Sequence, residues 1–280
     1  MRLNKYIVVI ALFLSVCSGG CDQDDTIEPE GKVSPKYTVP QGTEEFDVRI
    51  GEFYKNYGTM ILYQYDTLDA LWDVTSLVLN TANPYHVVPI KKSDVEVCVN
   101  MLFKDCFDLY PEEFLKKTLP RYIFLADTIS KSPSSNSYLY YSKTKTNLTF
   151  GYMNRESVTD ATTRQKLKAE INMGYIEYCI SIGEIVPPEA FTEGIPYGSI
   201  TYSNYRDLGI MHTLYFGLTL EDDFMYSLKA ILEGTELSLS RMFDDDPKSN
   251  RKRRCAVLVN EMKRIYGIDL EELSGFDLIR

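Results

Sequence analysis

The chain has 280 residues, with 30 Lys and Arg residues against 40 Asp and Glu residues and a formal net charge of −10. An acidic balance of this size argues against a nucleic-acid partner. The 21 tyrosines and 13 phenylalanines supply ample material for a hydrophobic core, so we expect a folded globular domain.

The N-terminus has the pattern of an export signal. A basic start precedes an apolar run over residues 6–16. That run is too short to cross a bilayer, because a transmembrane helix needs about 20 apolar residues. Small residues then lead to Cys21, an arrangement that resembles the cleavage and lipidation site of bacterial lipoproteins. Cys17 is a competing site, and ordinary secretion is the alternative. We therefore predict a signal peptide over 1–20 and a lipid anchor on Cys21.

The segment behind Cys21 predicts a tether. Its acidic start, Asp22 to Asp25, resembles the surface-export tag of Bacteroidetes lipoproteins, and a solvated linker is the alternative. Scattered Pro and Gly residues and the lack of apolar periodicity favour an extended tether over 21–43. The expected location is the outer membrane, facing the cell surface, with the lipid on Cys21 in the membrane. No comparable break follows, so we predict one domain over 44–280.

The first half of the domain is expected to alternate short helices and strands. In the helix over 43–57, Phe46, Ile50 and Phe53 recur at helical spacing, and Gly58 ends it. Ser93, with Glu96 three residues later, predicts a capping box. The pattern predicts further helices over 93–110 and 111–119, and strands over 59–65, 70–75, 121–129, 138–142 and 147–153.

The second half is predicted to be mostly helical. The longest helix, over 159–182, has an apolar face through Leu167, Ile171 and Tyr175 and a polar face through Glu170 and Glu177. Further helices are expected over 220–236, capped by Thr219, and from Asp246 to Tyr266. Short strands followed by helices indicate the α+β class.

Four cysteines remain after the signal region. They lie in apolar stripes of the predicted helices, so we expect buried free thiols at Cys98, Cys106, Cys179 and Cys255. No Cys-x-x-Cys pair occurs, which argues against zinc ribbons and thioredoxin-like chemistry.

Three stretches together carry a family resemblance. They are YKNYGTMILYQY at 54–65, YPEEFLKKTLP at 110–120 followed by YIFLA at 122–126, and EMKRIYGIDLEEL at 261–273. Their order and spacing resemble the zinc-binding metallopeptidase family of Bacteroidetes lipoproteins, over most of residues 44–275. The resemblance implies a zincin-like fold and association with surface nutrient-uptake systems.

The zinc motif of such enzymes is missing. Zincins need His-Glu-x-x-His on a helix, where two histidines one turn apart hold zinc and the glutamate activates its water. The equivalent helix over 159–182 has no histidine, and the whole chain has only His86 and His212. We therefore predict a degenerate family member without peptidase activity and without a zinc cofactor.

A non-standard metal site is the alternative. Glu170 or Glu177 would act as the catalytic carboxylate and, with His212 and Glu221, would hold zinc in an active metal-dependent peptidase. The competing interpretation, which we favour, places Glu170 and Glu177 on a solvent-exposed helix face and lets Glu221 complement a helix dipole.

An inactive relative can still bind. An old active-site groove would take a peptide or a glycan, with Tyr197, Tyr202 and Tyr205 as exposed stacking candidates in an irregular segment. A surface uptake complex is the other expected partner, and a purely structural envelope component is a further hypothesis. The basic run 251–254 is expected to be a solvated helix face.

Overall fold

The structure is a computed structural model that describes residues 36–71, 85–132, 134–212, 217–246 and 248–278. Residues Val39–Arg280 form one compact unit, separate from Met1–Thr38. The predicted signal peptide, Cys21 and most of the predicted tether lie outside the described residues.

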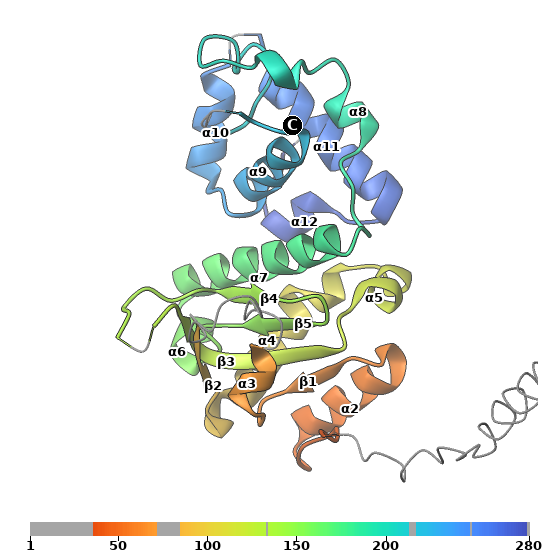
Figure 1. Cartoon of the computed structure of the whole chain (residues 1–280), viewed down its shortest axis with the longest axis vertical. Coiled ribbons are helices and arrows are strands. Elements are labelled where there is room, and N and C mark those ends of the chain that lie inside the picture. Colours follow the sequence, from red (N-terminus) through yellow and green to blue (C-terminus); the bar gives the residue numbers. More distant parts are fainter. Residues whose placement is uncertain (1–35, 72–84, 133, 213–216, 247, 279–280) are drawn as a thin grey trace, which may run out of the picture. The chain divides into compact units, whose positions relative to one another are not determined.

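The sheet of the folded unit is mixed (Figure 1). Its strands are β1 (Met60–Leu62), β2 (His86–Pro89), β3 (Tyr122–Ser130), β4 (Tyr141–Lys143) and β5 (Asn147–Phe150). The order is β1-β3-β5-β4, and β2 pairs with the second half of β3. β3 is parallel to β1 and β5, whereas β4 runs antiparallel to β5 and ends the order of strands.

The two faces of the sheet pack against different elements. Side chains alternate across a strand, so Ile123 and Leu125 of β3 enter the main core while Phe124 packs on Tyr65. On that second face, Asn147 donates a hydrogen bond to the carbonyl of Asp69 in α3 (Thr67–Ala70). The predicted strand over 70–75 is wrong at Ala70, which is helical, and residues 72–75 lie outside the described residues.

The N-terminal helices cover the main-core face. They are α2 (Glu45–Tyr57), α4 (Val95–Asp105), α5 (Glu112–Thr118) and α6 (Arg155–Thr159). Gly58 ends α2 in the left-handed conformation, as predicted. The capping box predicted at Ser93 does not form, because a 3-10 turn, Lys92–Asp94, precedes α4 and Asp94 takes the cap position. A second 3-10 turn, Phe107–Leu109, follows α4.

The C-terminal part is helical. Its elements are α7 (Ala161–Ser181), α8 (Glu189–Thr192), the 3-10 turn Tyr197–Ser199, α9 (Leu220–Leu232), α10 (Glu236–Asp244), α11 (Asn250–Tyr266) and α12 (Leu270–Ser274). Thr219 caps α9 as predicted, and Asp222 completes a capping box there. The last long helix begins later than predicted, at Asn250, although Asp246 accepts a hydrogen bond from the backbone of Arg251.

α7 lies between the sheet and the C-terminal helices (Figure 1). One side packs on β4 and β5 and the other on α9 and α12. The prediction that its polar face meets solvent is therefore wrong. Met173 is completely buried, and Glu170 and Glu177 are half-buried.

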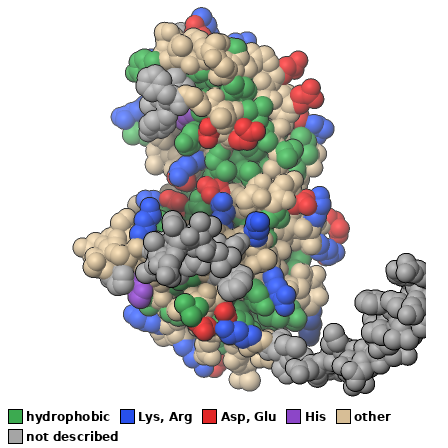
Figure 2. Space-filling view, in the orientation of Figure 1, with side chains coloured by type: hydrophobic (Ala, Val, Ile, Leu, Met, Phe, Trp, Pro, Cys, Tyr) green, Lys and Arg blue, Asp and Glu red, His purple; other side chains and the backbone are tan. Residues whose placement is uncertain are grey.

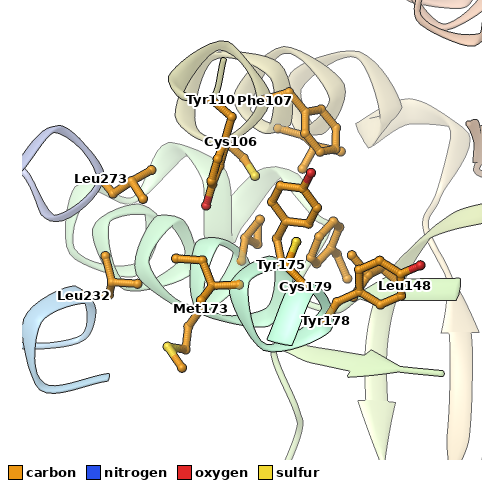
Figure 3. Close-up of a cluster of buried hydrophobic side chains, with 14 of the residues drawn as sticks. Cys106, Phe107, Tyr110, Leu148, Met173, Tyr175, Tyr178, Cys179, Leu232 and Leu273 are labelled. Carbon is orange, nitrogen blue, oxygen red and sulfur yellow. The ribbon is translucent and has the colours of Figure 1, made fainter. Parts of the chain in front are cut away.

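The centre of the core contains a satisfied polar network. Asn172 of α7 accepts a hydrogen bond from the Tyr110 hydroxyl and donates to the carbonyls of Asp105 and Lys168. Such pairing matters because a buried polar group without a partner is costly. Among the labelled side chains of Figure 3, Cys106 and Cys179 lie between the tyrosines and phenylalanines of this core.

The thiol prediction is confirmed. All four predicted cysteines are buried and free. Burial raises the pKa of Cys98, Cys179 and Cys255 to about 12, which keeps these thiols protonated and unreactive. The α+β class is also confirmed. Among the described residues, no helix combines the length and apolarity needed to cross a bilayer.

Candidate functional site

The helix expected to carry the zinc motif meets the sheet at Gly174. A Cβ atom added to Gly174 would lie 2.6 Å from Cγ of Tyr141 in β4. No side chain fits there without displacing the ring, because real contacts of a Cβ are almost never shorter than 3.0 Å. The ring of Tyr141 thus occupies the space into which a longer residue 174 would project.

A polar contact reinforces this closure. Glu177, almost one turn further along α7, lies 3.8 Å from Nζ of Lys143. Burial raises the pKa of Tyr141, and the charge of nearby Glu177 raises it further. Tyr141 therefore stays protonated. The ring contact at Gly174 and one ion pair hold β4 against α7.

Two further carboxylates lie near Glu177. Glu170 faces the end of α9, where the carboxylate of Glu233 is 3.4 Å from Nζ of Lys229. Burial raises the pKa of both glutamates, and the charge of Glu170 adds to the effect on Glu233, while Lys229 lowers both. Together with Lys143 and Glu177, these residues form what we call the carboxylate–lysine cluster.

His212 belongs to a different network. Its Nε2 atom is 3.6 Å from Oδ1 of Asp223, whose side chain is completely buried. Asp223 also forms an ion pair with Arg254 and accepts a hydrogen bond from the Tyr197 hydroxyl at 2.9 Å. Burial alone would raise the pKa of Asp223, but the neighbouring His212 and the hydrogen bonds from Arg254 and Tyr197 hold it below its ordinary value. Contacts within the protein therefore already occupy the carboxylate oxygens of Asp223.

The alternative zinc set is not assembled. Glu221 is exposed in the first turn of α9, where it complements the helix dipole. Within the described residues, no group of three or more His, Cys, Asp or Glu side chains is placed to hold a metal ion. The structure therefore does not bring Glu170 or Glu177 together with His212 and Glu221.

The three tyrosines proposed for stacking differ in exposure. Tyr202 is 73% exposed, in agreement with expectation. Tyr197 is half-buried and is bound to Asp223. The expectation for Tyr205 is wrong, because its ring is buried in a small apolar cluster with Ile210 and Leu218. Only Tyr202 of this set presents its ring freely to solvent.

The basic run 251–254 is not a solvated face. Arg251 and Arg254 are buried on the same side of α11, since residues three apart share a helix face. Arg251 donates from Nε to the carbonyl of Ile210, and Arg254 donates to the carbonyl of Phe191. Only Arg253 of this run is fully exposed.

Sequence reasoning missed Tyr141, Lys143 and Glu233 as parts of the site. Strand β4 is only three residues long, and its pairing with α7 depends on tertiary contacts. Gly174 did carry a signal, because an isolated glycine inside a long helix often marks a close approach. Sequence reasoning also missed Asp223, because a run of acidic residues at the start of α9 does not show which carboxylate is buried.

Comparison with known proteins supports the fold. No protein-family model matches the sequence, and no curated protein matches it. Among solved structures, the chain is similar to one from Bacteroides caccae described as "a putative zinc-binding metallo-peptidase", with a TM-score of 0.51 and 14% sequence identity. The match covers 85% of this chain and 98% of that one. The chain therefore has an α+β fold like that of this metallopeptidase-like structure.

Gly174→Ala should lower the free energy of unfolding by about 1–3 kcal/mol, because the added methyl group overpacks against Tyr141. The measurement is urea unfolding followed by circular dichroism. In a Tyr141→Ala background, the same glycine change should cost much less, since the ring is gone. Equal costs in both backgrounds would contradict the proposed contact.

The substitution Glu233→Gln should stabilise the protein more at pH 7 than at pH 4. A glutamate whose pKa is raised in the folded state binds its proton more tightly there, so its contribution to stability is present in acid and is lost as the pH rises through the folded pKa. Glutamine has no titrating carboxyl group, so the variant does not lose this stability as the pH rises. Thermal unfolding across this pH range checks the sign, with exposed Glu193→Gln as the control for removing a surface charge. A variant equally stabilised at both pH values would show that the carboxyl does not titrate as described.

Proposed function

We propose that this chain is a non-catalytic binding protein built on a metallopeptidase-like fold. The observation that carries the proposal is the contact between Tyr141 and Gly174. The ring of Tyr141 fills the space beside α7 into which a zinc ligand at position 174, one turn after Glu170, would have to project.

The side chains around this contact do not suit zinc. Structural and catalytic zinc sites use three or four ligands from Cys, His, Asp or Glu at about 2.0–2.3 Å. Here Glu177 is engaged by Lys143 and Tyr141, and Glu233 is engaged by Lys229. A metal ion would have to displace these cations or draw in His212, which lies against buried Asp223. No hydrolytic step is therefore assigned to these residues.

Binding at a membrane surface completes the proposal. The sequence motivates lipid attachment at Cys21, a flexible acidic tether and location on the outer face of the outer membrane. The folded domain would then hold a peptide or glycan close to the cell surface, as an accessory of a nutrient-uptake system. A binding role needs a stable surface rather than a reactive centre, and function resides in such sites rather than in the fold itself.

Purified protein should contain well below one zinc ion per chain by elemental analysis, and should leave casein uncut with or without added zinc. The expected reason is that the available carboxylates are paired with lysines. Stoichiometric zinc that a chelator removes, and that Glu170→Gln or Glu177→Gln also abolishes, would overturn the proposal. Exposed Glu193→Gln is the matched control for carboxylate loss.

Lipid attachment has a separate test. Cells that express the full chain with a labelled fatty acid should incorporate label into this protein, and Cys21→Ala should abolish it while Cys17→Ala should not. Release of the Cys21→Ala variant from the membrane fraction without detergent would agree with anchoring through Cys21. Label retained after Cys21→Ala would place the anchor elsewhere.

A further inference from the structure

Three tyrosines gather where β4 and β5 meet the first turns of α7. The rings of Tyr140 and Tyr152 stack with centroids 4.3 Å apart and an angle of 18° between their planes. Tyr138 meets Tyr152 edge-on at 6.3 Å, and 39% of Tyr138 is exposed. We call these three residues the tyrosine cluster. It differs from the exposed tyrosines that the sequence alone suggested.

The backbone holds this cluster in an unusual way. Tyr152 has a φ angle of +57°, in the left-handed region that bulky residues rarely adopt. Its backbone N–H donates to the carbonyl of Asp127 at 3.0 Å, and the next residue, Met153, donates to the carbonyl of Ala126. These two bonds keep the strained residue in place, with its ring on Tyr140. Strain of this kind concentrates at functional sites.

A pocket adjoins the tyrosine cluster through Lys166. Nζ of Lys166 lies 4.9 Å from the centroid of the Tyr140 ring, and the neighbouring Tyr140 raises the pKa of this lysine. Lys166 also lines a pocket of about 410 Å³ between α7, the turn from α9 to α10, and α12. That volume is within the range of about 300–1,000 Å³ that small-ligand pockets occupy.

The pocket lining mixes hydrogen-bonding groups with an apolar wall. Gln165, Thr235 and Ser274 offer amide and hydroxyl groups, and Phe276 and Leu273 supply apolar surface. Glu233 also lines the pocket, and its buried Oε1 accepts no hydrogen bond from the described residues, although Lys229 lies 3.4 Å away. Because this oxygen is enclosed, a ligand in the pocket would instead reach the exposed amide of Gln165.

The charges of the pocket balance. Lys166 and Lys168 face Glu170 and Glu233 in its lining. On the face of the molecule drawn in Figure 2, acidic and basic side chains are likewise interspersed rather than gathered into a patch of one sign. A strongly charged ligand would need a surface of the opposite sign, so a neutral ligand with many hydroxyl groups fits better.

We propose that the tyrosine cluster and this pocket together bind a neutral oligosaccharide. One sugar unit would lie in the pocket, hydrogen-bonded to Gln165, and a unit further along the same chain would pack its apolar face on Tyr138. The inference rests on the proposed binding function and names its ligand class.

Calorimetric titration tests this with the full chain and four neutral probes: maltohexaose, cellohexaose, xylohexaose and mannohexaose. At least one should bind, and Tyr138→Ala and Gln165→Ala should each weaken that binding about tenfold. Both side chains are exposed, so their loss should leave thermal unfolding unchanged. Tyr226→Ala, which removes a ring of similar exposure (37%) on α9 outside this pocket, is the matched control and should bind like the unaltered protein.

Three results would overturn the inference. They are no binding of any of the four neutral probes, undiminished binding by both variants, or binding only of oligogalacturonate or of a tryptic casein digest. A digest that binds through Tyr138 would assign the surface to peptides instead. None of these results depends on zinc content or casein cleavage, so failure here is distinguishable from failure of the non-catalytic assignment.

Discussion

The position of α7 between the sheet and the C-terminal helices is the constraint on which the rest of the structure depends. Over residues 167–179 both long sides of the helix are covered, so each residue there must match a neighbour on one side or the other. At Gly174 the match is so close that even a methyl group would collide with Tyr141. This contact brings β4 onto the helix, and it decides which polar side chains can reach the space beside it. Packing at near-crystalline density leaves little freedom for a ligand set to reassemble there.

The buried charges divide into two groups with different consequences. In the C-terminal helices, Asp223 and Arg254 are paired and hydrogen-bonded on all sides, and the pKa of Asp223 stays below its ordinary value. Around α7, Glu170 and Glu233 are incompletely compensated, and burial raises their pKa. The first group behaves as a structural connection between α9 and α11. The second lines the pocket in which we propose that a ligand binds.

The fold resembles that of a structure described as a metallo-peptidase, whereas the proposed binding function rests on the side chains of this chain. A similar backbone occurs in a structure described as a zinc-binding metallo-peptidase, but similarity at 14% identity establishes the fold alone. In this chain, an aromatic ring and two lysines engage the groups beside α7 that a metal would otherwise need. The same region carries stacked tyrosines and a pocket of balanced charge. These features are the basis on which we propose reversible recognition.

Local sequence pattern by itself determined the α+β class, most helices, the end of α2 at Gly58, the Thr219 cap and the burial of four thiols, because each depends on periodicity or on residues within one turn. It also showed that the His-Glu-x-x-His motif is absent. Only the tertiary structure decided that the polar face of α7 is covered, that Arg251 and Arg254 are buried, and that Tyr205 is enclosed while Tyr138, Tyr140 and Tyr152 meet. A half-polar helix has the same sequence pattern whether water or a second layer of helices lies against it. The difference arises from contacts between residues far apart in the chain, which no local pattern encodes.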